Sequence, residues 1–223
     1  MGPEKPCEPS ERRLLVLHAL RLKGLATTET VTSTYGLDLE STETDLEQCR
    51  REGLVTSRGD VWSLTSDGRG AGERMLAEEL DRCSRQRKTP VGPLVTIQYD
   101  RFVPLNREML EICTRWQVRN HDPVELNDHS DRSYDAAVIA DLENAHRHAQ
   151  LICGQLETLL SRFARYRSGF DYALGRIADG AIEWFTKPTI LSYHTLWFEL
   201  HEDLLATLGL DRATETVRHC DQR

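Results

Sequence analysis

A seven-residue repeat of apolar side chains, beginning near Ala136, most constrains the fold of this 223-residue chain. Its apolar positions alternate four and three residues apart: Val138, Leu142, Ala145, Ala149, Ile152, Leu156, Leu159 and Phe163. This spacing is typical of an α-helix with one continuous apolar stripe. The repeat therefore predicts a long helix packed along its length, either in a bundle or in an interface between two copies of the chain.

Other segments after residue 88 also have helical patterns. We expect helices at 102–118, at 166–180 and at 190–208, the last two ending at Gly180 and Gly209. Segment 88–95, KTPVGPLV, has two prolines and a glycine and is typical of a linker. The polar stretch 119–135 predicts a loop with His129 exposed, in which Asp128 or Ser130 caps the following helix. We therefore predict a second domain at 89–223, an antiparallel bundle of roughly four main helices.

Residues 1–88 predict a different unit, with three short helices before a hairpin. The first helix ends at Lys23-Gly24, the second spans 27–35 with Thr27 or Thr28 as its N-cap, and the third spans 39–52. The inner face of the third helix is expected to carry Leu39, Thr42, Leu46 and Cys49.

The segments LVTS and VWSL are two short strands by their β-branched and aromatic content, and a further helix follows them from about 67 to 88. Between the strands lie Arg58-Gly59-Asp60, where Gly59 can adopt the positive φ of a tight turn. In a secreted protein this triplet would suggest an integrin ligand. The N-terminus has no apolar segment typical of a secretory signal, so we expect only a hairpin turn.

The segment LEQCRREGLVTSRGDVWSLTSDGR resembles MarR-type regulators, in which a helix runs into "GLV", a wing hairpin follows, and an "LTxxGR" exit starts the next helix. Those pieces are here Gly53-Leu54-Val55 and Leu64 to Arg69. The resemblance implies a mainly α protein whose residues 1–88 form a winged helix-turn-helix, three helices plus a β-hairpin wing. NDHSDRSYDAAVIADL and SYHTLWFELHEDLLATLG resemble an actinobacterial group of MarR-like regulators with a winged helix before a helical domain. That group implies no particular ligand.

Composition narrows the possible environments. Six scattered cysteines without a CxxC pair are typical of reduced thiols in a cytosol. No apolar run approaches the roughly 18–20 residues of a membrane span, so we expect a cytoplasmic protein without a membrane partner. The net charge of −8 means that any binding to nucleic acid must come from a local arrangement.

The third helix is the expected reader of double-stranded DNA. We predict DNA contacts by Ser41, Thr44, Gln48 and Arg51 on that helix and by Arg58 at the wing. Glu40, Glu43 and Glu47 on the same outer face oppose phosphate binding, although a Glu47–Arg51 pair would offset one of them. Partial compensation is expected from nearby cations, which besides Arg51 and Arg58 are Arg12, Arg13, Arg21, Lys23, Arg50, Arg69 and Arg74. Because residues 1–88 carry 14 Lys and Arg against 16 Asp and Glu, a protein-binding adaptor without DNA binding stays open.

The helix at 190–208 predicts a possible effector site. Its two histidines lie in a seven-residue register that we expect to face the apolar side of the helix. The members of this register are Leu191, His194, Phe198, His201, Leu205 and Leu208. With Tyr193, Trp197 and His146 they could line a pocket for a small-molecule effector. Ordinary hydrogen-bonded core histidines are the alternative, and a mononuclear metal site formed by His146 or His148 with His194 or His201 is a third. We expect no cofactor and no bound metal.

No nucleophile elbow, P-loop, dinucleotide fingerprint or HExxH motif is present, so we do not expect an enzyme. Cys49 on the third helix could be a redox switch, although a buried, inert thiol is the commoner outcome. We expect a homodimeric DNA-binding transcriptional regulator whose helical domain dimerises, senses an effector, or both. The alternatives are the adaptor and a regulator that senses metal or redox state.

Overall fold

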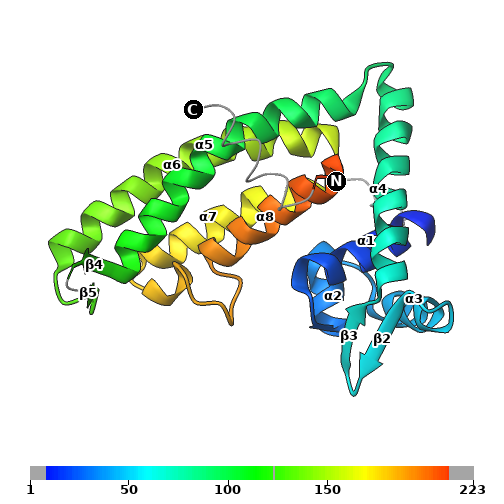
Figure 1. The fold of residues 1–223 in the computed structure, drawn as a ribbon, viewed down its shortest axis with the longest axis horizontal. Helices are drawn as coiled ribbons and strands as arrows, with labels where there is room; N and C mark the ends of the chain where they lie inside the picture. Colours follow the sequence, from blue (N-terminus) through cyan, green and yellow to red (C-terminus); the bar gives the residue numbers. More distant parts are fainter. Residues whose placement is uncertain (1–8, 123, 211–223) are drawn as a thin grey trace. The chain divides into compact units, whose positions relative to one another are not determined.

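The computed structural model describes residues 9–122 and 124–210 and is mainly helical with a small antiparallel sheet (Figure 1). The chain divides into two compact units. One comprises the described residues up to Val91 together with residues 201–210, and the other runs from Gly92 to Leu200. The expected boundary lay between residues 88 and 89, with everything after it in the second domain. Within the described residues, no helix is long and apolar enough to cross a membrane.

The first unit contains the expected three short helices and hairpin. Its elements are α1 (Pro9–Lys23), β1 (Ala26–Thr27), α2 (Thr28–Tyr35), α3 (Leu39–Arg51), β2 (Val55–Arg58), β3 (Val61–Leu64) and α4 (Ser66–Arg87). The three strands form one antiparallel sheet in the order β1-β3-β2. The short strand β1 was not expected from the sequence.

Side-chain caps set where these helices begin. Thr27 accepts a hydrogen bond from the Thr30 N–H, which confirms Thr27 as the N-cap of α2, and Asp38 accepts one from Ser41 at the start of α3. Thr65 caps α4 in the same way, through the N–H of Gly68. Each cap satisfies a backbone N–H that the first turn of a helix leaves without a partner.

The core of the first unit lies between α1, α3 and the sheet. Its buried members are Val16, Leu17, Ala19, Leu20, Ala26, Val31, Leu46, Cys49, Val55 and Trp62. Thr42 is also buried, as expected. Leu39 was expected there too, and that prediction is wrong, because this side chain is 45% exposed at the first position of α3. Leu37, in the preceding turn, packs against the core instead.

The hairpin turn is shorter than expected. Arg58 pairs with Val61 and is the last residue of β2, so the turn consists of Gly59 and Asp60 alone. Gly59 has a φ of 65°, and Asp60 has no positive φ. Glycine at the first position of a two-residue loop is the preference of the type II′ turn, which matches the twist of paired strands.

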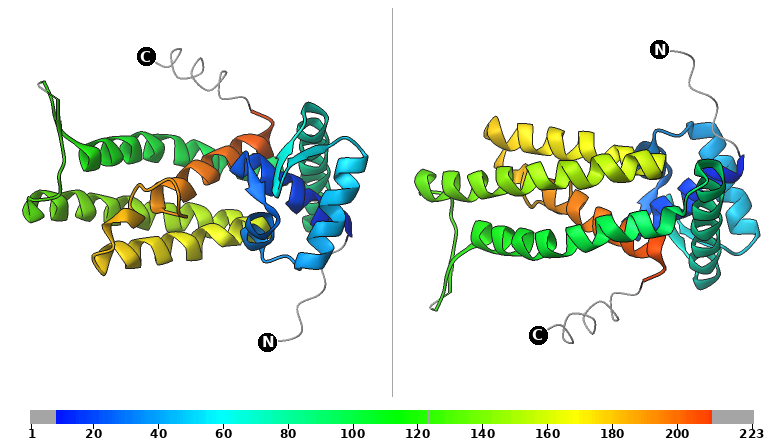
Figure 2. Two further views of the ribbon diagram at one scale, coloured as in Figure 1. Left: turned by 90° about the horizontal axis from the view of Figure 1, so that it is seen from below. Right: turned by 90° about the horizontal axis from the view of Figure 1, so that it is seen from above.

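The second unit contains four long helices and a second hairpin. Its elements are α5 (Val91–Gln117), β4 (Val118–His121), β5 (Val124–Leu126), α6 (Arg132–Leu159), the 3-10 turn η1 (Ser161–Phe163), α7 (Ala164–Ala178), the 3-10 turn η2 (Ile182–Trp184) and α8 (Tyr193–Leu208). Within this unit, successive helices run alongside one another in opposite directions (Figures 1 and 2). Residues from His201 on, in the second half of α8, belong to the first unit.

The seven-residue repeat lies on α6 as predicted. Six of its positions, from Val138 to Leu156, are buried in the helix, whereas Leu159 is half-buried at the helix end and Phe163 lies in η1. Two other predictions are wrong. Segment 119–135 contains the β4–β5 hairpin and is not a plain loop, and the N-cap of α6 is Asp131. The helix expected to start at residue 190 begins at Tyr193.

The expected linker at 88–95 is mostly helical. Only Lys88 to Pro90 separate α4 from α5, because α5 begins at Val91, whose N–H donates to the Ser84 hydroxyl at 2.9 Å. Val91 and Val95 are buried. Prolines signalled a linker, yet the first turn of a helix tolerates proline, since its N–H groups have no helical partner. Pro93 occupies that first turn.

Candidate functional site

The outer face of α3 presents most of the side chains predicted to contact DNA. Thr44, Gln48, Arg51 and Arg58 are exposed, whereas Ser41 is half-buried and its N–H is bound to the capping Asp38. The Thr44 hydroxyl donates back to the Glu40 carbonyl. The Arg58 guanidinium forms no ion pair with any of the described residues. The structure therefore leaves α3 and the hairpin accessible within their own unit.

A chain of polar contacts fixes the C-terminal end of α3. Arg13 of α1 holds both carboxylate oxygens of Glu52, and the Gln48 amide donates to Glu52 at 2.7 Å. The Gln48 carbonyl oxygen then accepts two hydrogen bonds from Arg51. The bonds from Arg13 and Gln48 lower the pKa of Glu52 to about 2. The predicted contact residues Gln48 and Arg51 are therefore oriented from α1 through Glu52.

The arginines of α1 do not compensate the acidic face of α3 as expected. Arg12 pairs with Asp45, Arg13 with Glu52, and Arg21 with both Glu73 and Glu202. These contacts hold the helices of the unit together and occupy the guanidinium groups. The predicted Glu47–Arg51 pair is also wrong, because Glu47 binds Arg50, one residue earlier. Glu40 and Glu43 remain exposed on the outer face.

The structure brings together three of the five residues predicted to bind an effector. His146 of α6 lies 3.3 Å from the Tyr193 hydroxyl, and the Tyr193 ring stacks on Trp197. Trp197 also stacks on Phe102 and donates its indole N–H to Asn106 at 2.8 Å. Tyr193 and Trp197 are buried and the Trp197 indole N–H has its partner. These rings therefore form a packed core with a polar edge at His146.

The other two predicted effector residues lie on a different face of α8. His194 and His201 are half-buried, and between them Phe198 is 49% exposed, so the expected inward register is wrong at these positions, although Leu205 of the same register is buried. The buried positions are one residue out of step with it: Tyr193, Leu196, Trp197, Leu200 and Leu204. His201 belongs to the first unit, whereas His146 and Tyr193 belong to the second.

Cysteine and metal chemistry find little support in the described residues. Burial raises the pKa of the Cys49 thiol, which disfavours the reactive thiolate that a redox switch on α3 would need. No group of three or more His, Cys, Asp or Glu side chains in the described part of the chain is placed to hold a metal ion. His148, offered as a ligand, is exposed on α6.

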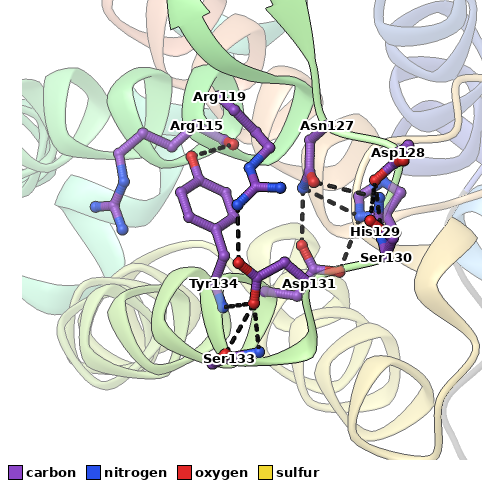
Figure 3. Close-up of polar contacts among 10 residues, drawn as sticks. Arg115, Arg119, Asn127, Asp128, His129, Ser130, Asp131, Ser133 and Tyr134 are labelled. Atoms are coloured by element: carbon purple, nitrogen blue, oxygen red, sulfur yellow. Dashed lines mark hydrogen bonds and ion pairs between the residues drawn. The ribbon is translucent and has the colours of Figure 1, made fainter.

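A polar cluster at the β4–β5 hairpin was missed by sequence reasoning (Figure 3). Asn127 is buried and its amide nitrogen donates to the Trp116 carbonyl at 3.1 Å and to Asp135 at 2.7 Å. Its side-chain oxygen accepts the N–H of His129, whose φ of 61° is rare for a residue other than glycine. Asp135, also buried, lies 3.0 Å from His129 Nδ1.

The hydrogen bonds of this cluster fix which nitrogen of His129 carries the proton. Asn127 has two amide hydrogens, and the Trp116 carbonyl and Asp135 take both, so its 3.2 Å approach to His129 Nδ1 is not a third bond. His129 Nδ1–H therefore donates to the Asp135 carboxylate. The imidazole packs against Trp116, which stacks on Phe185 with ring centroids 4.2 Å apart. His129 was expected to be exposed, and it is instead a partly buried member of this cluster.

A second set of contacts ties the hairpin to the start of α6 (Figure 3). Asp131 caps α6 and pairs with Arg119 of β4 at 2.8 Å, and Arg119 lies over the Tyr134 ring. The bonds from Tyr134 and Ser133 lower the pKa of Asp131 to about 2. The Tyr134 hydroxyl donates to the Arg115 carbonyl. The sequence indicated this cluster only through the many Asn, Asp and His residues between Trp116 and the α6 repeat. That composition predicts a polar loop equally well.

Comparisons of the chain with family models, with curated proteins and with solved structures gave no match.

Proposed function

We propose that this chain is a cytoplasmic, non-enzymatic transcriptional regulator that binds double-stranded DNA as a homodimer. In this proposal the first unit is a winged helix-turn-helix, with α3 in the major groove and the β2–β3 hairpin as the wing. Two observations together support it best: the order of the helices and strands, and the solvent exposure of α3 and the hairpin. Helices α1 to α3 precede the β2–β3 hairpin, β1 between α1 and α2 completes a sheet ordered β1-β3-β2, and the outer face of α3 and Arg58 at the hairpin tip are both exposed.

The charges on this face predict a modest dependence of DNA affinity on salt. Arg51 and Arg58 are exposed cations of α3 and the hairpin that form no ion pair among the described residues, whereas the α1 arginines are paired internally. Two such cations in each protomer of a dimer would give a slope of log affinity against log salt of about −3.6. This slope is shallow for a regulator, so we expect measurable binding mainly at low ionic strength.

The experiment is a fluorescence-anisotropy titration of duplex DNA from the chain's own upstream region at several salt concentrations. Arg58→Ala should weaken binding and make the slope shallower by about 1.8, because one cation is lost from each protomer. Arg107→Ala, an exposed arginine on α5, is the control of equal charge and should leave the slope unchanged. Equal slopes for the two variants, or no binding by the wild type, would exclude this role for the wing.

A protein-binding adaptor is the second candidate function. It is favoured because the arginines of α1 form ion pairs within the unit. The outer face of α3 keeps Glu40 and Glu43 exposed, while arginines 12, 13 and 21 are occupied. Such a face suits a basic protein surface better than a phosphate backbone. Glu40→Gln with Glu43→Gln separates the two roles: if α3 contacts DNA, this double variant should bind duplex several-fold more tightly at low salt. No gain would favour the adaptor.

A further inference from the structure

His146 of α6 contacts two other helices of the second unit, one through each ring nitrogen. Nε2 lies 3.1 Å from Asp171 of α7, and Nδ1 lies 3.3 Å from the hydroxyl of Tyr193 at the start of α8. The imidazole is largely buried, Tyr193 is fully buried, and Asp171 is exposed. One side chain therefore joins α6, α7 and α8.

The partners dictate the position of the proton on the neutral ring. An ionised carboxylate can only accept hydrogen bonds, so Nε2 carries the hydrogen and donates it to Asp171. Nδ1 then has a lone pair and accepts the hydrogen of the Tyr193 hydroxyl. Both contacts are satisfied only in this neutral form.

We propose that His146 is a proton-operated latch, whose neutral imidazole holds α8 through Tyr193 and whose protonation releases that bond while keeping Asp171. A proton on Nδ1 would face the hydroxyl hydrogen, so Tyr193 must turn its hydrogen away. Among the described residues, this hydroxyl has no other hydrogen-bond partner, and its burial keeps it from water. Protonation therefore leaves a buried donor unsatisfied on α8, whereas the Asp171 contact becomes a full ion pair.

The surrounding charges do not remove this asymmetry. On α6, Glu143 and Arg147 act on the ring with opposite signs, and on α7 Asp171 favours the cation. Burial outweighs these effects and lowers the pKa of His146 below its ordinary value of 6.5. Near Tyr193, burial raises the pKa of the Cys113 and Cys153 thiols to about 12, so neither brings a charge. The latch therefore opens below pH 6.5, which makes the proton one effector for the sensing role that the sequence led us to expect of the helical domain.

Hydrogen exchange of the full chain tests the latch without DNA, so a failure to bind DNA would leave it standing. The readout is the protection factor of amides in the first turns of α8, which corrects for the direct effect of pH. The wild type should lose about tenfold of this protection between pH 7 and pH 5. His146→Gln should abolish the acid step, and Tyr193→Phe should show low protection at both pH values, because its latch is already open.

Three further variants distinguish the latch from general acid sensitivity. Asp171→Asn should move the step to lower pH, because the cation loses its carboxylate. His148→Gln, on an exposed position of α6, and His194→Gln, beside Tyr193 on α8, should keep the wild-type step. A step that survives in His146→Gln, or that disappears in His194→Gln, would overturn the proposal.

Discussion

At the scale of single residues, close packing against Leu54 explains why position 68 requires a glycine. A Cβ built on Gly68 would lie 1.8 Å from the Leu54 carbonyl oxygen. That oxygen cannot withdraw, because it accepts the Thr65 N–H at 3.0 Å. Gly68→Ala should therefore destabilise the chain by about 3 kcal/mol or more, measured by urea denaturation.

Gly72→Ala on the same helix is the matched control. Its added Cβ would meet only the Leu17 Cβ, at an ordinary distance of 3.9 Å. Alanine is the better helix former, so this variant should be more stable than the wild type by about 0.5–1 kcal/mol. If both variants lost stability equally, the cause would lie in the helix and not in the Leu54 contact.

Asn127 should be the most sensitive polar residue of the hairpin cluster. Asn127→Ala removes the donors to Asp135 and to the Trp116 carbonyl, and it leaves buried acceptors unsatisfied. We expect a loss of about 3 kcal/mol in the free energy of unfolding. Asp128→Ala, whose exposed carboxylate binds only Ser130 among the described residues, should leave the free energy of unfolding almost unchanged. Similar losses in both variants would argue against a buried network.

The roles of some residues could be predicted from their neighbours in the sequence, and the roles of others could not. The Thr27 cap and the positive φ of Gly59 follow from the backbone near each residue, and both predictions are confirmed. The pairing of Arg13 with Glu52, 39 positions away, depends on how α1 packs on α3. No local pattern encodes that distance. For the same reason the expected supply of cations to the α3 face was overestimated.

At the scale of elements, helix α5 contains a proline that interrupts its hydrogen bonding. Pro104 lies inside this helix on an exposed position, where it cannot donate the N–H that the carbonyl of residue 100 would accept. Pro104→Ala should therefore raise the free energy of unfolding by about 1–3 kcal/mol in thermal or urea denaturation. Thr114→Ala on the same helix should add about 0.5 kcal/mol by propensity alone. A loss of stability in Pro104→Ala would mean that α5 needs a bend at this point.

The helices differ in how well their apolar pattern predicted the buried face. On α6 the repeat identified the core positions, although Leu151 of the same helix is 71% exposed and Asp135 is buried. On α8 two apolar stripes lie one residue apart, and composition could not rank them. The stripe with Tyr193 and Trp197 is buried because Phe102, Phe170 and Asn106 are placed to receive it. Which of two apolar stripes on a helix is buried depends on the tertiary structure.

At the scale of the whole molecule, charge predicts two opposite effects of acid. The chain carries a net charge of −8 near neutral pH, so protonation relieves repulsion among its carboxylates. Individual groups with shifted pKa values act the other way. Burial lowers the pKa of His146 and His194 below 6.5, and hydrogen bonds hold the pKa of Glu52 and Asp131 at about 2.

The sign for each group follows from which form the fold prefers. The two histidines are held neutral, so their contribution to stability is complete above pH 6.5 and falls as acid forces a proton on them. The two carboxylates are held ionised, so their contribution is lost from their ordinary values of 4.5 and 3.8 down to about 2. The free energy of unfolding should therefore fall in two stages as pH is lowered from 7.

Urea denaturation at a series of pH values checks this order of events. The double variant His146→Gln with His194→Gln should flatten the upper stage and leave the lower one, while Glu52→Gln with Asp131→Asn should do the reverse. Relief of carboxylate repulsion alone would instead make the wild type more stable between pH 7 and pH 5.5. A rise in stability over that interval would show that the overall charge of the chain outweighs the effect of the two imidazoles.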